Sequence, residues 1–313
     1  MKSVLLCGCG NIGFRHLQAM LVMPDPAAIT IIEPNPAAHA RIAALFGPAK
    51  KRGFRIDLRD AEPPTRQRFD LVVIATAADT RRVAFDSIVA AHDVGMFIFE
   101  KVLFQTPNDL DEVGQILAAR GITAYVNCPR RYFPGYRELL AQVAPARPLN
   151  ITISGAGFGL ASNGIHLIDL AEYLNGAELT SFEATGLEAG SVEAKRAGCV
   201  EVFGRVSGKL SNGAALTITC GDREAMAIQI TLEGAGFAAV IDELASQIEI
   251  RAAPPTGFAS KFVSEIWEIY HESLTTGQCG LTPYADSARQ HGLFLAALSA
   301  HLGLPAASPC PIS

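Results

Sequence analysis

The chain has little charge and no segment suited to a nucleic acid or a membrane. Charged residues make up 18% of the 313 positions, and the formal net charge is −5. No basic stripe runs along the sequence, which argues against a partner with a phosphate backbone such as DNA. The short basic run Lys50–Arg52 is typical of a solvated loop. No apolar stretch approaches the roughly 18 residues that a membrane span requires.

The cysteines lack the spacing of a metal site. There are seven, and none form the paired CxxC pattern that zinc sites show. An odd number of scattered cysteines is most simply explained by a reduced, cytoplasmic setting. The apolar stretch after Lys2 is too short for a secretory signal and is interrupted by Gly8 and Gly10. We therefore expect a cytoplasmic protein without a metal.

The first half of the chain alternates short apolar runs with helical patterns. Hydrophobic residues make up 49% of the sequence, enough for substantial cores, and the length suits two domains. Residues 3–6, 29–32 and 71–75 are apolar or β-rich, whereas residues 12–23 and 36–46 have helical patterns. This alternation predicts an α/β fold with a parallel, doubly wound Rossmann sheet.

The pattern changes near residue 128. Beyond it, β-rich runs alternate in hydrophobicity and are broken by turn residues, and Asn212-Gly213 is a strong hairpin signal. The second half is therefore expected to form an α/β domain with an open, largely antiparallel sheet. We expect a first domain at 1–128 and a second domain at 129–313.

The segment GCGNIG, which starts at Gly8, fits the GxGxxG pattern between a strand and a helix. Gly8 permits a tight turn, Gly10 lets the backbone approach a pyrophosphate, and Gly13 lets the helix pack closely on the strand. Asn11 and Ile12 begin the helix, whose free N–H groups attract phosphates. The alternative is a purely structural turn.

Glu33 supplies the second mark of a dinucleotide site. It ends the second β-rich run, about 20 residues after the glycine motif. A carboxylate there accepts hydrogen bonds from ribose hydroxyls and repels a 2′-phosphate, which favours NAD over NADP. The alternative is a surface glutamate, but strand, loop, helix and acid together favour the nucleotide.

Several short motifs together resemble those of the Gfo/Idh/MocA oxidoreductases over nearly the whole chain. The motifs are GxGxxG followed by Arg15-His16, DLVVIAT at 70–76, Glu100-Lys101 in place of Glu-Lys-Pro, NCPRRYFPGYREL, and His166 with Asp169 as HxxD. The resemblance implies a dinucleotide-binding Rossmann domain at 1–128, a substrate-binding and oligomerisation α/β domain at 129–313, and no metal. It also implies NAD-dependent hydride transfer at a hydroxyl or keto carbon of a sugar, cyclitol or sugar nucleotide.

The resemblance extends to assembly and setting. The family commonly pairs its C-terminal sheets, and a sheet face with alternating apolar residues needs cover. We therefore expect a homodimer or homotetramer with a small sugar-type substrate and no nucleic-acid or membrane partner. The segments SNGIHLIDL and NCPRRYFP are similar to those of family members that act in bacterial surface-polysaccharide sugar pathways.

Two positions depart from the family pattern. Val102 stands where the family has proline, and Ser162 stands where many of its dehydrogenases have aspartate, four residues before His166. Serine forms hydrogen bonds but supplies no full charge. This departure leaves open a non-catalytic NAD-binding regulator, and an NAD-using hydrolase or lyase is a further alternative. Gly164 is expected to leave room for a substrate ring near the backbone.

The resemblance assigns the catalytic roles. Lys101 follows an apolar strand, so we expect it at the carboxyl end of the sheet, where it would hydrogen-bond the reacting hydroxyl. His166 is the acid–base candidate because imidazole titrates near neutral pH. Asp169 either orients His166 or bonds at the domain junction. Thr76 is expected beside the cofactor, and Glu100 either shapes the cofactor pocket or pairs with Lys101. A surface lysine and a core histidine are the structural alternatives.

Substrate contacts are expected from two regions. Arg130, Arg131 and Tyr132 begin the segment that crosses into the second domain. The guanidinium groups there are expected either to bind phosphates or carboxylates of the substrate or to bridge the two domains, and the sequence favours neither role. Asn163 and Tyr284 are the expected sugar contacts.

Overall fold

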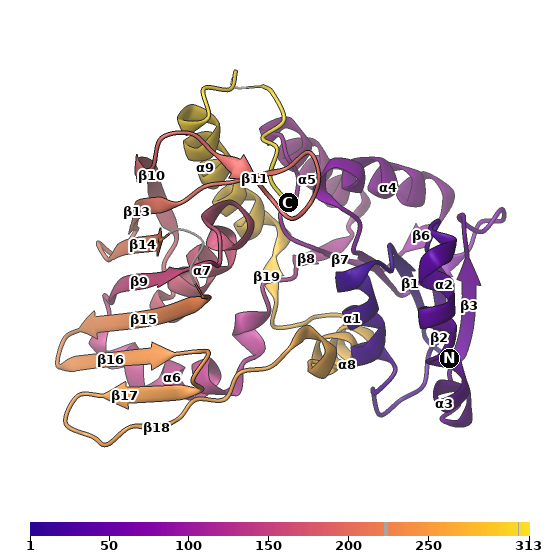
Figure 1. Cartoon of the computed structure of the whole chain (residues 1–313). Coiled ribbons are helices and arrows are strands. Elements are labelled where there is room, and N and C mark those ends of the chain that lie inside the picture. Colours follow the sequence, from indigo (N-terminus) through magenta and orange to yellow (C-terminus); the bar gives the residue numbers. More distant parts are fainter. Residues whose placement is uncertain (222–224, 306) are drawn as a thin grey trace. The chain divides into compact units, whose positions relative to one another are not determined.

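The computed structural model describes residues 1–221, 225–305 and 307–313, which form two compact units (Figure 1). The first unit comprises residues 1–104, 111–127 and 261–284. The second unit comprises residues 105–110, 128–260 and 285–313. The chain thus changes unit after Asn127, beside the expected boundary, but residues 261–284 return to the first unit and residues 105–110 belong to the second.

A seven-stranded sheet forms the first unit. Its order is β19 (Thr282–Pro283), β8 (Thr123–Val126), β7 (Met96–Phe99), β5 (Leu71–Ile74), β1 (Ser3–Cys7), β2 (Ala28–Ile32) and β3 (Arg55–Arg59). All neighbours run parallel except β19, which pairs antiparallel with β8 at the edge. Strands that proceed outward on both sides of β1 are typical of the doubly wound Rossmann fold, so the predicted fold is confirmed.

The pairing of β19 explains why residues 261–284 belong to the first unit: this late segment extends the parallel sheet. The central strands β5 and β7 are buried at every position, as continuous apolar runs predict. The helices on this part of the chain are α1 (Asn11–Met20), α2 (Pro36–Ala43), α3 (Phe46–Lys51), α4 (Ala78–Ala91), α5 (Pro107–Arg120) and α8 (Glu268–Thr276). The short strands β4 (Arg68–Phe69) and β6 (Asp93–Val94) form a separate parallel pair.

An eight-stranded sheet forms the second unit, and Figure 1 shows its strands as a ladder. Its order is β10 (Leu179–Leu187), β13 (Gly204–Leu210), β14 (Ala215–Gly221), β9 (Asn150–Ala156), β15 (Ala227–Gly234), β16 (Phe237–Asp242), β17 (Gln247–Ile250) and β18 (Thr256–Gly257). Only β9 and β14 pair in parallel, so the predicted largely antiparallel sheet is confirmed. Gly213, with φ +87°, forms the predicted turn between β13 and β14.

The two faces of this sheet differ in character. Along β9, Ile151 and Ile153 are buried, whereas Thr152 and Ser154 are exposed. Helix α7 (Leu160–Asn175) contacts both β14 and α6 (Pro134–Val143). The apolar positions are therefore buried within the unit, and the other face carries hydroxyl groups. Helix α9 (Tyr284–His301) is the last, and no helix in the described residues is long and apolar enough to cross a membrane.

Candidate functional site

The glycine loop joins β1 to α1 in the first unit. Gly8 has φ +83°, and a Cβ on Gly13 would lie 2.0 Å from the Gly8 carbonyl oxygen, so the turn and the packing each require glycine. A Cβ on Gly10 would instead meet no atom within 4 Å. Gly10 is also the N-cap of α1, and no side chain caps the helix there. The open space and the uncapped helix N-terminus fit a pyrophosphate.

Glu33 follows β2 and is directed at the glycine loop. Its Oε2 accepts a hydrogen bond from the Cys9 backbone N–H at 2.7 Å, and its Oε1 accepts one from the Asn35 N–H at 3.0 Å. The residue is only 7% exposed. The carboxylate therefore fixes the loop, and its predicted contact with ribose stays a prediction. Thr76 borders the same loop, because a Cβ on Gly8 would lie 3.0 Å from the Thr76 nitrogen.

Arg41, on α2, was missed by sequence reasoning. Its guanidinium donates to the Gly10 carbonyl at 3.2 Å and to the Asn11 side chain at 3.3 Å. The same group lies 4.4 Å from the centre of the Phe14 ring. A cation beside this loop can meet a phosphate, and an arginine near it accommodates the 2′-phosphate of NADP in Rossmann proteins. A basic residue on the helix after Glu33 was the available signal.

A buried hydrogen-bond network surrounds Glu100 at the end of β7. The Glu100 Oε1 accepts from Asn127 Nδ2 at 2.6 Å and lies 2.7 Å from His16 Nε2. His16 Nδ1 lies 2.6 Å from the Tyr270 hydroxyl oxygen. The Lys101 backbone N–H donates to Glu100 Oε2 at 3.1 Å. The network therefore fixes the backbone of Lys101 at the carboxyl edge of the sheet. His16 was noticed only as part of a motif, and Tyr270 gave no signal.

The hydrogen bonds and charges around Glu100 favour its ionised form. Burial raises the pKa of this carboxyl, but the hydrogen bond and charge of His16, the charge of Lys101 and the Asn127 bond outweigh burial. Together they hold the pKa of Glu100 below its ordinary value of 4.5. Because a carboxylate only accepts hydrogen bonds, His16 Nε2 carries a proton toward it.

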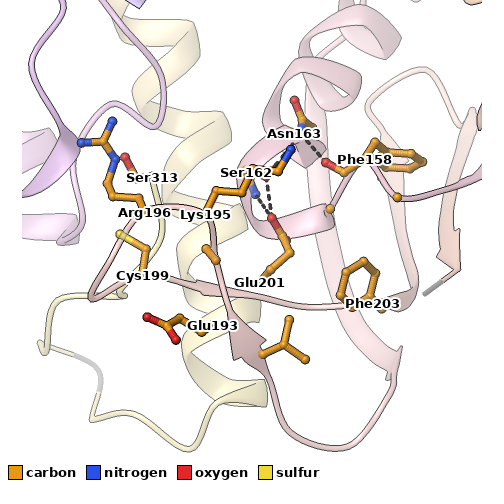
Figure 2. A pocket seen from close by; sticks show the side chains of 14 residues that line it. Phe158, Ser162, Asn163, Glu193, Lys195, Arg196, Cys199, Glu201, Phe203 and Ser313 are labelled. Atoms are coloured by element: carbon orange, nitrogen blue, oxygen red, sulfur yellow. Dashed lines mark hydrogen bonds between the residues drawn. The ribbon is translucent and has the colours of Figure 1, made fainter. Parts of the chain in front are cut away.

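The second unit has a pocket of about 730 Å³ beside the N-terminus of α7 (Figure 2). Ser162 and Asn163 line it from α7, and the two short strands β11 (Val192–Glu193) and β12 (Val200–Glu201) line it from a hairpin. Lys195 and Arg196, both exposed, lie between these strands. A pocket of this size suits a small-molecule ligand.

Glu201 caps helix α7 from inside this pocket wall, and sequence reasoning missed it. Its Oε1 accepts from the Ala161 N–H at 2.5 Å. Its Oε2 accepts from the Ser162 hydroxyl, also at 2.5 Å (Figure 2). A Cβ on Gly159 would lie 2.2 Å from Oε2, so the carboxylate requires glycine there. Asn163, a predicted sugar contact, donates from Nδ2 to the Phe158 carbonyl.

Asp169 and His166 lie on α7, as the HxxD resemblance implies. Asp169 is fully buried, and its carboxylate accepts from Arg131 Nε at 3.0 Å and from Arg131 NH2 at 2.7 Å. The Asp169 charge is therefore matched by a guanidinium of the same unit. That Asp169 orients His166 stays a prediction.

Arg130 is paired in the same way. Its guanidinium donates to the two oxygens of Glu243 at 2.8 and 2.7 Å, and the Tyr136 hydroxyl donates to Glu243 at 2.6 Å. Both arginines expected to meet substrate anions thus have carboxylate partners within the second unit. Each pair neutralises the charge of its arginine through Nε and Nη2, which weakens the case for either as the main anion-binding group.

Three other expected positions are packed. Tyr132 is buried, and Tyr284 is buried with its ring centre 5.8 Å from that of Phe99. The expectation for Gly164 was wrong: a Cβ there would lie 2.9 Å from the Phe294 ring, so this glycine makes room for α9 and not for a substrate. Within the described residues, no group of three His, Cys, Asp or Glu could hold a metal ion.

No family model and no curated protein matches the chain. Solved structures share its fold over almost its whole length. UDP-N-acetylglucosamine 3-dehydrogenase GnnA from Acidithiobacillus ferrooxidans is 17% identical, with a TM-score of 0.68 and 97% of each chain covered. The chain has the two-domain fold of the Gfo/Idh/MocA-type dehydrogenases.

Two further structures show the range of this fold. Biliverdin reductase from Synechocystis, bound to biliverdin and NADP+, is 12% identical, with a TM-score of 0.73 and 96% of this chain and 99% of that chain covered. GenD2 from gentamicin A biosynthesis, bound to NAD, is 15% identical, with a TM-score of 0.67 and 96% and 94% covered. The fold that the sequence resemblance implied is thus confirmed.

Proposed function

We propose that this chain is an NAD(P)-dependent oxidoreductase that moves a hydride between a nicotinamide and a hydroxyl or keto carbon of a sugar-type substrate. One observation carries the proposal: the open space at Gly10 lies at an uncapped helix N-terminus. The loop follows β1 and Lys101 follows β7, so both lie at the carboxyl edge of one parallel sheet, where ligands bind in such folds.

NAD is the cofactor that Glu33 favours, because its carboxylate lies beside the loop and repels a 2′-phosphate. Arg41 acts in the opposite direction, since its guanidinium is positioned at the same loop. Both cofactors occur with this fold, because GenD2 is bound to NAD and biliverdin reductase to NADP+. We favour NAD because the carboxylate is buried and fixed by two backbone donors, so it cannot easily turn away.

The catalytic roles follow from the chemistry of the two candidates. A bound nicotinamide accepts or donates the hydride. Lys101 hydrogen-bonds the reacting oxygen, and the network around Glu100 holds the lysine backbone in place. His166 takes up and returns the hydroxyl proton, as an imidazole can near neutral pH.

A sugar nucleotide is the substrate class that the second unit favours. Asn163 lies on the pocket wall, and its amide oxygen is the group that it offers to a sugar hydroxyl. Lys195 and Arg196 offer exposed positive charge for a diphosphate, whereas Arg130 is held by Glu243. GnnA acts by its name on a UDP-sugar. A role in surface-polysaccharide sugar metabolism is part of this proposal.

A panel of sugars and sugar nucleotides, each with NAD(H) or NADP(H) and read at the reduced-nicotinamide absorbance, tests the function. We expect turnover with a nucleotide-linked sugar. A Lys195→Ala/Arg196→Ala variant should raise KM for that substrate but not for the matching free sugar. Cofactor binding without turnover would favour a regulator, and product formation without net nicotinamide reduction would favour a hydrolase or lyase.

The proposal includes a cytoplasmic homodimer or homotetramer. Thr152 and Ser154, which are exposed, and Thr217 and Thr231, which are half-buried, form an uncharged patch on the sheet for a second copy to cover. The seven cysteines all lie in the described residues and none forms a disulfide, which suits a reducing compartment. Light scattering at micromolar concentration checks the assembly, and a pure monomer would contradict it.

A further inference from the structure

We propose that Glu201 is a positioning residue of the active site: it holds the Ser162 hydroxyl as a hydrogen-bond acceptor on the helix face that carries His166. This inference rests on the proposed function for the role of His166. It arises from a contact between residues 39 positions apart in the sequence.

Four donors converge on the Glu201 carboxylate. They are the backbone N–H groups of Ala161, Ser162 and Val202, at 2.5, 3.3 and 3.1 Å, and the Ser162 hydroxyl at 2.5 Å. Glu201 is only 9% exposed. Such a set satisfies a buried carboxylate, and a negative charge at a helix N-terminus is stabilised by the helix dipole. The first turn of α7 is therefore locked to β12.

The direction of the Ser162 bond follows from its partners. A hydroxyl has one proton, and a carboxylate only accepts, so the Ser162 proton points to Glu201. Asn163 Nδ2 donates to Ser162 Oγ at 3.2 Å. Toward every other neighbour, Ser162 Oγ can act only as an acceptor.

Residues four apart on a helix share one face, so Ser162 and His166 are neighbours in this sense. Because Ser162 Oγ donates its own proton to Glu201, it favours the form of the His166 ring that directs an N–H toward Ser162. Glu201 therefore polarises the Ser162 oxygen into a stronger acceptor, in place of a charge at position 162 itself.

Helix capping alone does not explain this arrangement. A serine or aspartate at the N-cap would cap α7 locally. The N-cap is instead Gly159, which has φ +73° and no side chain. The space beside it is filled by the Glu201 carboxylate, which comes from strand β12. The structure also shows that Ser162→Asp alone would set two carboxylates against each other. An acid at position 162 and one at position 201 are thus alternatives.

A double-mutant cycle tests the coupling between the two residues. Glu201→Gln should lower kcat by up to about 100-fold, with little change in KM, because a misplaced group costs turnover more than binding. Ser162→Ala should lower kcat similarly. In the Ser162→Ala background, Glu201→Gln should lower kcat no further, although the melting temperature should still fall. Independent, multiplying effects on kcat, or a loss of stability alone, would overturn the proposal.

Rescue and a control complete the kinetic test. Glu201→Gln/Ser162→Asp should recover most of the turnover that Glu201→Gln loses, because it returns the carboxylate to the same place. No recovery in a folded double variant would contradict the proposal. Glu183→Gln, which removes an exposed carboxylate from β10 of the same unit, should leave turnover unchanged.

A second readout separates this inference from the proposed function. If the unmodified protein turns over no member of the panel, the proposed function fails. The ¹⁵N shifts of the His166 ring, assigned with His166→Gln, then test Glu201 directly. Glu201→Gln should change the tautomer balance of His166, and Glu183→Gln should not. Unchanged ring shifts in Glu201→Gln would overturn the inference.

Discussion

His16 Nε2 lies 2.7 Å from Glu100 Oε1, and both groups are buried in the first unit. His16 belongs to α1, the helix that begins at the glycine loop, and Glu100 directly precedes Lys101. The helix that would receive the pyrophosphate and the lysine that would meet the substrate therefore depend on the same carboxylate. The geometry of this part of the site is determined by a buried network rather than by a flexible loop.

His16→Leu should destabilise the first unit strongly. It leaves the Glu100 carboxylate buried without its main partner, and breaking a buried pair costs about 3–5 kcal/mol. Tyr270→Phe removes the hydroxyl beside His16 Nδ1 and should cost less, about 1–3 kcal/mol, because it leaves a buried neutral nitrogen, not a buried charge, without that partner. Urea unfolding of both variants gives the comparison. Equal losses in the free energy of unfolding for the two variants would mean that the pair of His16 and Glu100 does not stabilise the first unit.

The acid stability of the protein should depend on Glu100. Its pKa is lower in the folded protein than its ordinary value, so its contribution is present above that value. The contribution is lost as the pH falls through the folded pKa. The melting temperature of the unmodified protein should therefore fall below about pH 4.5, and that of Glu100→Gln should fall less steeply. Parallel curves for the two proteins would contradict this assignment.

Two glycines of the loop should respond differently to alanine. Gly13→Ala should impair folding, because its Cβ would overlap the Gly8 carbonyl. Gly10→Ala should fold normally and lose most cofactor affinity, because its Cβ enters only the space that a pyrophosphate needs. Gly47→Ala is the matched control, since a Cβ there also meets nothing within 4 Å. Calorimetry measures the NAD affinity of each variant, and thermal melts measure its stability. Full NAD affinity in Gly10→Ala would mean that the nucleotide binds elsewhere.

Glu33 and Arg41 should set the cofactor preference in opposite directions. The unmodified protein should bind NAD more tightly than NADP, Glu33→Ala should narrow the difference, and Arg41→Ala should widen it. The reason is charge: a 2′-phosphate is repelled by the carboxylate and attracted by the guanidinium. Calorimetry with both cofactors measures each preference. Tighter NADP binding to the unmodified protein would overturn the proposed role of Glu33.

Local patterns in the sequence predicted the elements that depend on neighbouring residues. The apolar runs of β5 and β7, the turn at Gly213 and the glycine loop all follow from residue types a few positions apart. The alternation of strand and helix likewise predicted a parallel, doubly wound sheet.

Long-range pairs could not be predicted in this way. Arg130 meets Glu243 across 113 positions, and Ser162 meets Glu201 across 39, and both depend on how the strands of the second unit align. The return of residues 261–284 depends on β19 adding to the edge of the first sheet. Arg131 was expected to meet a substrate anion or to bridge the domains, and its pairing with Asp169 joins residues 38 positions apart.

Lys101→Met tests the central claim most directly, because it removes the ammonium while leaving the backbone N–H that bonds Glu100. NAD binding and net NADH formation with the best substrate of the panel should be measured on the same preparations of the variant and the unmodified protein. We predict that the unmodified protein forms NADH, and that the variant binds NAD normally but loses almost all turnover. Near-normal turnover by Lys101→Met, or binding without any NADH formation by the unmodified protein, would contradict the account.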